Sequence, residues 1–322
     1  MDGTLVARLE AIAAVRRDEV LARHTTFGIG GPADLFVTVR SADQLRDAFL
    51  SVREAGVPCF VLGAGSNILV GDAGVRGVVI DNQAKAHRIA PLVIGTDSPV
   101  SLPPSVESPD GASVVWAESG ASFAALARSL ARDGYAGVEW ACGVPGTLGG
   151  AVIYNAGAYD GCLADVLLAV TLIDGAGDQR YLPAPELKLG YRTSALLRGE
   201  LGDCVVLTVE IAVTRGDARA LAAQVAAFDR QRLDAQPRGR NSGSTFKNPE
   251  GRRAWELIDD AGLRGHRIGG ARISPKHCNF IENLGDARAA DVFALMSEAK
   301  RRVRERFGIE LEDEVQRVGE GF

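Results

Sequence analysis

Two glycine-rich segments constrain this chain more than any other feature of its sequence. The first is residues 63–67 (GAGSN), which follow a short apolar run at 59–62, and the second is residues 144–157 (VPGTLGGAVIYNAG). Glycine has no Cβ, so segments of this kind let the backbone turn sharply and come close to another group. At these two loops the fold must therefore bring the backbone close to another group.

The first segment has the beginning of a dinucleotide-binding fingerprint, but Ile68 stands where the third glycine belongs, which argues against a Rossmann fold. Its consecutive small residues still expose N–H groups that can hold a pyrophosphate, and a plain tight turn is equally compatible with them. The glycines of 144–157 would let the backbone lie flat against a planar or anionic ligand, although packing alone could also select them. Two such loops, neither of them a P-loop, favour a dinucleotide held by backbone amides.

Charge and composition exclude several classes of protein. The net charge of −5 disfavours a general nucleic-acid binder, which would carry a basic surplus. The five cysteines include no CxxC pair and the four histidines no HExxH motif, so we predict neither a disulfide framework nor a metal site. The N-terminus lacks the apolar core of a signal peptide, and no apolar run approaches the ~18 residues that cross a bilayer. We expect a cytoplasmic protein.

Hydrophobic periodicity predicts alternating helices and strands, with a change of texture near residue 216 that marks a C-terminal α+β domain. We expect a helix at 1–23 and an irregular, exposed loop or linker at 82–112. Further helices are expected at 43–55, from Ser122 to Gly134, at 218–236 before Pro237, near 252–262, and where Val292, Leu295, Met296, Ala299 and Val303 share one face. Strands are expected at 35–39, 59–62, 68–70, 78–80, 114–118 and 204–213, with a hairpin at 174–175 and either one more strand or a return segment in the tail.

Seven blocks of the sequence, in this order, resemble one enzyme family. They are residues 25–33 (TTFGIGGPA), 62–67 (LGAGSN), 143–159 (GVPGTLGGAVIYNAGAY), 243–249 (GSTFKNP), 268–271 (IGGA), 276–277 (KH) and 311–315 (LEDEV). Together they resemble the UDP-N-acetylenolpyruvoylglucosamine reductases of peptidoglycan precursor synthesis, the MurB family, in its shorter type. The resemblance covers nearly the whole chain.

The resemblance implies an α+β protein with the two-subdomain FAD-binding fold of the vanillyl-alcohol-oxidase (PCMH) type and a C-terminal substrate-binding domain. The expected boundaries are 1–81 and 82–214 for the two subdomains, 215–309 for the substrate domain and 310–322 for a return segment. It also implies non-covalent FAD, NADPH as hydride donor and a UDP-sugar substrate. We expect no nucleic acid, no membrane insertion and no obligate protein partner.

The family reaction assigns roles to individual residues. NADPH first reduces the flavin, hydride then passes to C3 of the enolpyruvyl group, and a serine that corresponds to Ser244 protonates C2. Arg192 corresponds to the arginine that faces the substrate carboxylate, and Glu314 to a glutamate near the reacting carbons. The expected substrate-binding residues are Tyr191, Lys247 and Asn248. The expected cofactor-binding residues are Gly63, Ala64, Gly65, Ser66, Asn67, Ile68, Gly120, Ala121, Pro145, Gly146, Thr147, Gly149, Gly150, Asn155 and Gly157.

The residues also allow other interpretations. Taken alone, Ser244 is a turn residue, Arg192 a surface ion-pair partner and Glu314 one acid in a charged tail. The chain departs from the family pattern at Gly28, where many members have Arg or Lys, at Asp313, where they have proline, and in the long 82–112 stretch. Two other functions stay open: a flavin-dependent oxidase or dehydrogenase of another small molecule, and a non-catalytic nucleotide-binding protein.

Overall fold

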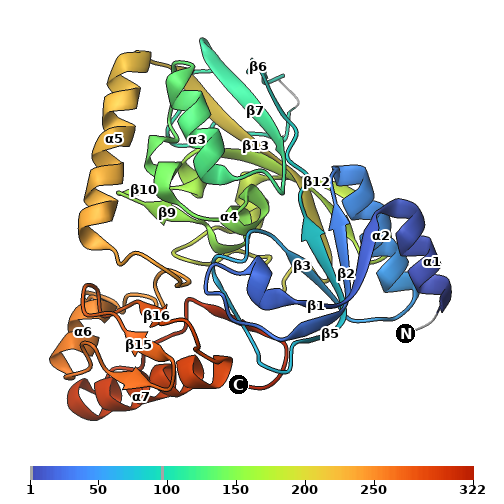
Figure 1. The fold of residues 1–322 in the computed structure, drawn as a ribbon. Helices are drawn as coiled ribbons and strands as arrows, with labels where there is room; N and C mark the ends of the chain where they lie inside the picture. Colours follow the sequence, from blue (N-terminus) through green and yellow to red (C-terminus); the bar gives the residue numbers. More distant parts are fainter. Residues whose placement is uncertain (1–2, 96–97) are drawn as a thin grey trace. The chain divides into compact units, whose positions relative to one another are not determined.

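The computed structural model describes residues 3–95 and 98–322 (Figure 1). The chain divides into two compact units, and each is built from several stretches of sequence. The first unit comprises Met1–Val15, Val37–Gly63 and Ile80–Gln231, and the second comprises Arg16–Phe36, Ala64–Val79 and Arg232–Phe322. The boundaries expected from the sequence, after 81, 214 and 309, stay a prediction.

The bounds of the elements follow the two units. The first unit holds α1 (Gly3–Ile12), α2 (Ala42–Glu54), α3 (Phe123–Arg132), α4 (Leu148–Tyr154), α5 (Ala218–Ala235, ending in the second unit), β3 (Cys59–Leu62), β6 (His87–Pro91), β7 (Ala112–Glu118), β8 (Tyr135–Ala136), β9 (Gly157–Ala158), β10 (Gly161–Cys162), β11 (Leu167–Asp174), β12 (Gln179–Pro183) and β13 (Cys204–Arg215). The second unit holds β4 (Ile68–Val70), α6 (Ala254–Asp260), β14 (Arg267–Ile268), β15 (Ala271–Ile273), β16 (Ile281–Asn283), α7 (Ala289–Phe307) and β17 (Gln316–Val318). The division falls within β1 (Ala14–Val20), β2 (Pro32–Val39) and β5 (Val75–Asn82).

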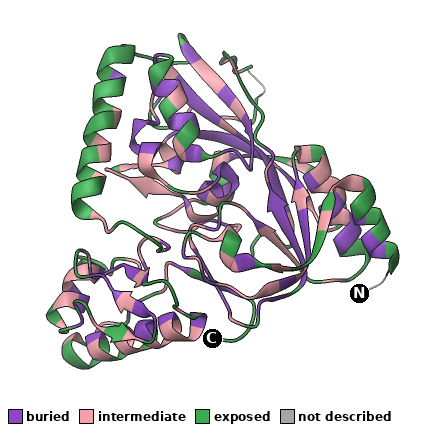
Figure 2. Ribbon diagram, in the orientation of Figure 1, coloured by how far each residue is buried: buried purple, intermediate pink, exposed green. Residues whose placement is uncertain are grey.

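An antiparallel six-stranded sheet forms the centre of the first unit. Its strand order is β12-β11-β13-β7-β6, and β8 pairs with the end of β13. The sequence predicts β13 from five apolar residues that alternate along one face, and all five are buried as expected: Val205, Leu207, Val209, Ile211 and Val213. The intervening Ala212 is also buried, because Val106 and Leu168 pack against it on the opposite face. Figure 2 shows β13 buried along most of its length.

Helices α3 and α5 lie close together in the first unit (Figure 1). Helix α3 begins as predicted at Ser122, whose side chain accepts a hydrogen bond from the N–H of Ala125. Helix α5 is mostly exposed (Figure 2), and Leu221 is its one residue classed as buried within the described chain. A bidentate ion pair between Arg128 and Asp229, with N–O distances of 2.6 Å, joins the two helices.

Two of the expected elements differ in the structure. The helix expected at 1–23 ends at Ile12, and residues 14–20 form β1 in a four-stranded sheet of order β1-β2-β5-β3. The helix-forming Arg and Glu side chains of this segment are overridden by strand pairing, a non-local interaction. The irregular stretch expected at 82–112 contains the edge strand β6, which pairs antiparallel with β7. It is also not fully exposed, since Val106 is buried; residues 96–97 lie outside the described chain.

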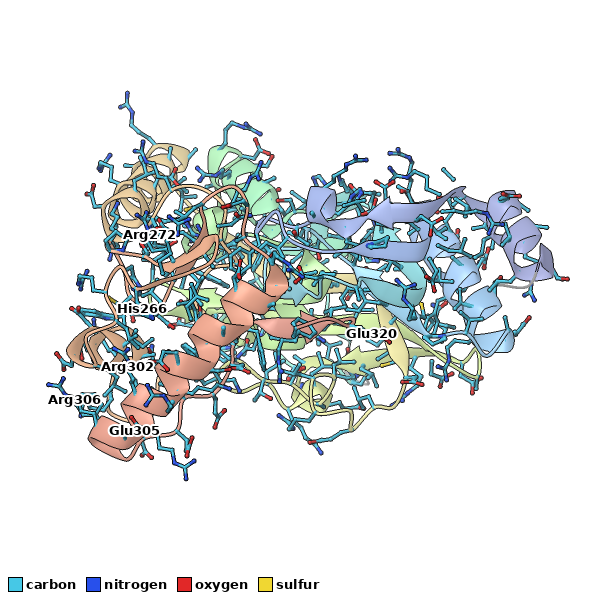
Figure 3. All side chains as sticks on the ribbon, turned by 60° about the horizontal axis from the view of Figure 1, so that its bottom comes forward. His266, Arg272, Arg302, Glu305, Arg306 and Glu320 are labelled. Carbon is cyan, nitrogen blue, oxygen red and sulfur yellow. The ribbon has the colours of Figure 1, made fainter. Side chains whose placement is uncertain are left out.

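The second unit packs two helices against a small sheet. The sheet has the order β14-β15-β16, and its core includes Leu257 and Ile258 of α6 and the apolar face of α7. The five α7 residues predicted to share a face, from Val292 to Val303, are all buried. Arg302, Glu305 and Arg306 lie along the C-terminal half of α7 (Figure 3). Strand β17 pairs in parallel with β4, so the tail contains a strand, one of the two structures expected there.

None of the helices within the described ranges 3–95 and 98–322 is long and apolar enough to cross a lipid bilayer.

The N-terminus of α7 is held by a side chain from a distant segment of the second unit. Asp72 Oδ1 accepts a hydrogen bond from Ala289 N at 2.8 Å, and its Oδ2 accepts one from Ala290 N at 3.2 Å. The first N–H groups of a helix have no partner within the helix, and the helix dipole favours a carboxylate there. Asp72 therefore fixes the start of α7 to the loop that follows β4.

We predict that Asp72→Ala lowers the free energy of unfolding by about 2 kcal/mol, because α7 loses both a capping acceptor and a favourable charge. Asp286→Ala removes an exposed carboxylate close to the same helix end and serves as the matched control. Urea denaturation measures both variants. Equal stability of the two variants would contradict the capping role.

Candidate active site

The turn 63–67 connects β3 to β4 as a sharp loop. Gly65 has φ +60°, and a Cβ at this position would collide with the carbonyl oxygen of His24. The carbonyl of Gly65 accepts a hydrogen bond from Thr26 N at 3.0 Å. Across the described chain, the backbone N–H groups of Ala64, Gly65 and Ser66 meet no acceptor. Only glycine fits at position 65, and the turn presents three neighbouring donors that suit an anion.

The second glycine-rich segment belongs to the first unit and is joined to residues 119–121. Leu148 N donates to Ala121 O at 2.9 Å, and Gly149 N donates to Ser119 O at 2.8 Å. The Cβ of a residue at 149 would lie 3.1 Å from Ser119 Cβ, so glycine permits this close packing. Thr147 caps α4 by accepting a hydrogen bond from Gly150 N.

Several backbone donors on these two joined segments remain available to a ligand. No acceptor within residues 3–95 and 98–322 pairs with the N–H of Gly120, Gly146 or Thr147. Gly63, at the end of β3, lies against the same region: a Cβ there would be 2.6 Å from Thr147 Oγ1. The first unit thus brings together Gly63, Gly120 and the loop after Pro145, three of the sequence segments expected to bind the cofactor.

The side chain of Arg192 donates to a backbone carbonyl group of the first unit. Its Nη2 donates to Gly157 O at 2.8 Å, and its own backbone has φ +52°. Asn155 Nδ2 donates to Gly190 O at 3.0 Å, and Ser194 Oγ donates to Ile153 O at 2.7 Å. A left-handed backbone at a residue other than glycine costs energy and is found at functional sites. The loop 190–194 is therefore fixed to the segment 153–157 at three points.

The hairpin that carries the Gly157 carbonyl is itself attached to α5. Strands β9 and β10 are joined by Tyr159 and Asp160, with φ +51° and +64°, which is the geometry of a two-residue type I′ turn. The Tyr159 hydroxyl donates to Phe228 O at 3.0 Å, and the two rings stack with centroids 4.4 Å apart. This support of Arg192 could not be seen in the sequence, since residues 159 and 228 lie far apart along the chain.

Ser244 lies in the second unit on a segment paired on both sides. Bridges join Ser244 to Phe280 and Phe246 to Asp313, both antiparallel. Thr245 N donates to Asn279 O at 2.8 Å, and Glu314 N donates to Thr245 O at 2.9 Å. The Ser244 side chain is half-buried, and its hydroxyl makes no hydrogen bond with the described residues. It is therefore available to a ligand.

Glu314 is connected to the glycine turn of the same unit. Asn67 Nδ2 donates to Glu314 O at 3.1 Å, and Gln316 N donates to Asn67 O at 3.0 Å. The neighbouring Asp313 carboxylate pairs with Lys300 of α7, 2.7 Å away. The structure thus brings together Asn67, Glu314 and the Ser244 segment, and the Asp313–Lys300 ion pair joins the segment that carries Glu314 to α7.

Other expected site residues make contacts that the sequence did not suggest. Lys247 Nζ lies 3.3 Å from the exposed Glu312 carboxylate, and Asn248 Oδ1 accepts a hydrogen bond from Ala254 N at the start of α6. Asn155 Oδ1 accepts from Ala164 N, so both ends of its side-chain amide bind backbone groups.

Tyr191 is 57% exposed, and the Arg192 guanidinium lies 5.6 Å from the centre of its ring.

The thiols of Cys59 and Cys278 are not activated. Burial raises the pKa of Cys59 to about 12 and that of Cys278 to about 11, so both thiols stay protonated near neutral pH. In the part of the chain that the structure describes, no group of three or more His, Cys, Asp or Glu residues could hold a metal ion.

Comparison with known proteins adds two family matches and close relatives. Residues 234–318 match the C-terminal domain of UDP-N-acetylenolpyruvoylglucosamine reductase, and residues 33–182 match an FAD binding domain. The chain is 39% identical over 304 residues to the UDP-N-acetylenolpyruvoylglucosamine reductase of Alkaliphilus oremlandii, covering 94% of this chain and 93% of that protein. The same-named protein of Lachnoclostridium phytofermentans is 35% identical over 324 residues, 99% of each chain. The solved structure of UDP-N-acetylenolpyruvylglucosamine reductase (MurB) from Thermus caldophilus is 35% identical, with a TM-score of 0.74 over 95% of this chain and 99% of that one.

We predict that Gly65→Ala lowers the free energy of unfolding by about 3 kcal/mol or more, because the added methyl group meets the His24 carbonyl in an already left-handed turn. Gly56 provides the matched control: it has φ +64°, but a Cβ there has nothing within 4 Å. Gly56→Ala should cost only about 1 kcal/mol. Denaturation of both variants in urea decides the matter, and equal losses would mean that the turn at 65 is not crowded.

Proposed function

Because the chain belongs to the family of UDP-N-acetylenolpyruvoylglucosamine reductases, we propose that Ser244, Arg192 and Glu314 carry out the chemistry of its reaction. The protein is an α+β flavoenzyme with the PCMH-type FAD-binding fold and a C-terminal substrate-binding domain. It is a UDP-N-acetylmuramate dehydrogenase, which reduces the enolpyruvyl ether of UDP-N-acetylglucosamine enolpyruvate to UDP-N-acetylmuramate with NADPH. This reaction belongs to peptidoglycan precursor synthesis.

The backbone donors of the glycine-rich segments fit FAD. The N–H groups of Ala64, Gly65 and Ser66, and those of Gly120, Gly146 and Thr147, meet no acceptor within the described chain. A diphosphate needs such donors, and glycine lets a bulky ring approach the backbone. We assign these segments to the cofactor, with Gly63, Asn67, Ile68, Ala121, Pro145, Gly149, Gly150, Asn155 and Gly157 as their further members. When bound, FAD takes up hydride from NADPH and supplies it to the substrate.

Arg192 is assigned to the substrate carboxylate. A guanidinium donates two parallel hydrogen bonds to a carboxylate and stabilises the negative charge that develops when the enolpyruvyl group is reduced. The carbonyl of Gly157 holds the Arg192 side chain in place before the substrate arrives, so little reorganisation is needed. Tyr191, exposed beside it, is assigned to the substrate, as are Lys247 and Asn248.

Ser244 is assigned as the proton donor to C2. A serine hydroxyl is a weak acid, so it can protonate carbon only where the acceptor is strongly basic and the hydroxyl is well placed. The observation that carries this assignment is the pairing of residues 244–247 on both sides, which fixes the backbone of Ser244 while its hydroxyl stays free of protein partners in the described chain. The segment 244–247 pairs with the segment around Asp313, and Glu314 follows Asp313 there.

We further propose that the enzyme acts in the cytoplasm and needs no obligate protein partner. Its dependence on NADPH supports the first of these proposals. Activity of the purified chain alone tests the second.

The proposed function is tested by NADPH oxidation that depends on UDP-N-acetylglucosamine enolpyruvate. The purified protein should show a flavin absorption band after reconstitution with FAD. The reduced enzyme should react faster with the enolpyruvyl sugar than with oxygen; rapid reoxidation by oxygen without turnover of the sugar would instead favour an oxidase.

We predict that Ser244→Ala leaves reduction of the flavin by NADPH nearly intact and slows substrate reduction by about a thousandfold or more, because no other group replaces the proton donor. Ser242→Ala, in the same turn, is the matched control and should keep both rates. Stopped-flow measurement of the two half-reactions separates the steps. An unaffected second half-reaction would remove Ser244 from the mechanism.

We predict that Arg192→Lys slows substrate reduction by about a hundredfold, because an ammonium keeps the charge but cannot donate the paired hydrogen bonds. Arg198→Lys changes an arginine of the same loop region that pairs with Glu200, and it should leave the rate unchanged. Both are compared by the rate of NADPH oxidation at saturating enolpyruvyl sugar. Wild-type rates in Arg192→Lys would show that only the charge matters.

A further inference from the structure

In the second unit, the side chain of Arg240 lies directly over Gly28. Gly28 has φ +65°, and a Cβ built there would be 2.9 Å from Arg240 Cδ and 3.3 Å from Arg240 Nε. The arginine therefore occupies the space that any larger residue at position 28 would need. The Cδ, Nε and Nη1 atoms of Arg240 all lie within 3.5 Å of that Cβ position.

A single buried side chain fixes this arrangement. Asn283, which is 8% exposed, donates its backbone N–H to Arg240 O at 2.9 Å. Its side-chain Nδ2 donates to Phe27 O at 2.9 Å and is 3.3 Å from Gly28 O. Asn283 thus binds both the backbone that carries the arginine and the backbone beneath it.

The guanidinium of Arg240 has no ionic or hydrogen-bond partner within residues 3–95 and 98–322. Other arginines of the second unit are paired, such as Arg264 with Asp259 and Arg272 with Glu282. An exposed, unpaired arginine is by itself common and carries no function. The groups around Arg240, however, indicate a binding role for its guanidinium.

Thr26 joins the Arg240 segment to the turn whose amides have no acceptor. Thr26 Oγ1 donates to the carbonyl of Asn241, the residue after Arg240, at 2.8 Å. Thr26 N donates to Gly65 O at 3.0 Å. Thr26 thus contacts both the residue after Arg240 and the middle residue of the turn 64–66, which places the Arg240 segment beside that turn. A guanidinium beside three free amides is suited to a phosphate oxygen.

We propose that Arg240 binds a phosphate group together with the backbone amides of residues 64–66. The proposal rests on the proposed role of that turn in nucleotide binding and adds a cation from a different segment of the chain. The phosphate can come from the diphosphate of FAD or from that of the UDP-sugar. Both offer the same chemistry, so the experiment has one arm for each source.

The first arm measures FAD binding without turnover. Flavin is removed from wild-type protein and from Arg240→Gln, Arg240→Lys and Arg238→Gln, and FAD is titrated back while its fluorescence is followed at several salt concentrations. Arg240→Gln should raise the dissociation constant about tenfold and weaken its dependence on salt, because one charge-assisted hydrogen bond is lost. The dissociation constant of Arg240→Lys should lie between those of wild type and Arg240→Gln. Arg238→Gln removes an exposed arginine two residues away and should match wild type.

The second arm measures the KM for the enolpyruvyl UDP-sugar in the same variants saturated with FAD. A rise confined to this KM supports the phosphate site and assigns it to the substrate, whereas a rise confined to the FAD constant assigns it to the cofactor. Unchanged values in both arms would overturn the proposal, and so would an equal effect of Arg238→Gln. Thermal unfolding verifies that each variant is folded. If wild-type protein bound FAD but did not reduce the enolpyruvyl sugar, the proposed function would fail while the first arm still tested Arg240.

Discussion

The backbone of Thr245 is the point on which the candidate site of the second unit depends. Its N–H donates to Asn279, its carbonyl accepts from Glu314, and the Glu314 carbonyl in turn accepts from Asn67. Four segments far apart in the sequence, around Asn67, Thr245, Asn279 and Glu314, are joined by these hydrogen bonds. Because Ser244 and Glu314 are neighbours of the joined groups, a shift of any one segment would displace both a proposed catalytic residue and the glycine turn.

The first unit positions Arg192 by a different means. Its loop is tied to the segment 153–157 through carbonyl groups, and its backbone is held in the left-handed region. The Gly157 carbonyl thus orients the Arg192 guanidinium through a hydrogen bond of 2.8 Å. The stacking of Tyr159 on Phe228 extends this support to α5. Electrostatic stabilisation of a developing charge requires this kind of fixed donor.

Local patterns predicted much of the fold. The strands at 59–62 and 68–70 were predicted from short apolar runs on either side of a glycine-rich turn, and the buried face of α7 from helical spacing, because each signal lies within its own segment. The helix expected at 1–23 was wrong in its second half. Residues 14–20 pair as a strand, and that pairing depends on a partner elsewhere in the chain. Burial of Val106 within an apparently irregular stretch was missed for the same reason, since Leu168 and Ala212 cover it.

The sequence by itself determined the glycine turns, most of the regular elements and, through seven ordered blocks, the family to which the chain belongs. It named Ser244, Arg192 and Glu314 as candidates but gave no account of what holds them. The tertiary structure decided that Asn67 supports Glu314, that Asp72 caps α7 and that Arg240 fills the space over Gly28. These contacts join residues more than 200 positions apart, and no local pattern encodes them, because a hydrogen bond or a close approach between distant segments exists only once the backbone has brought them together.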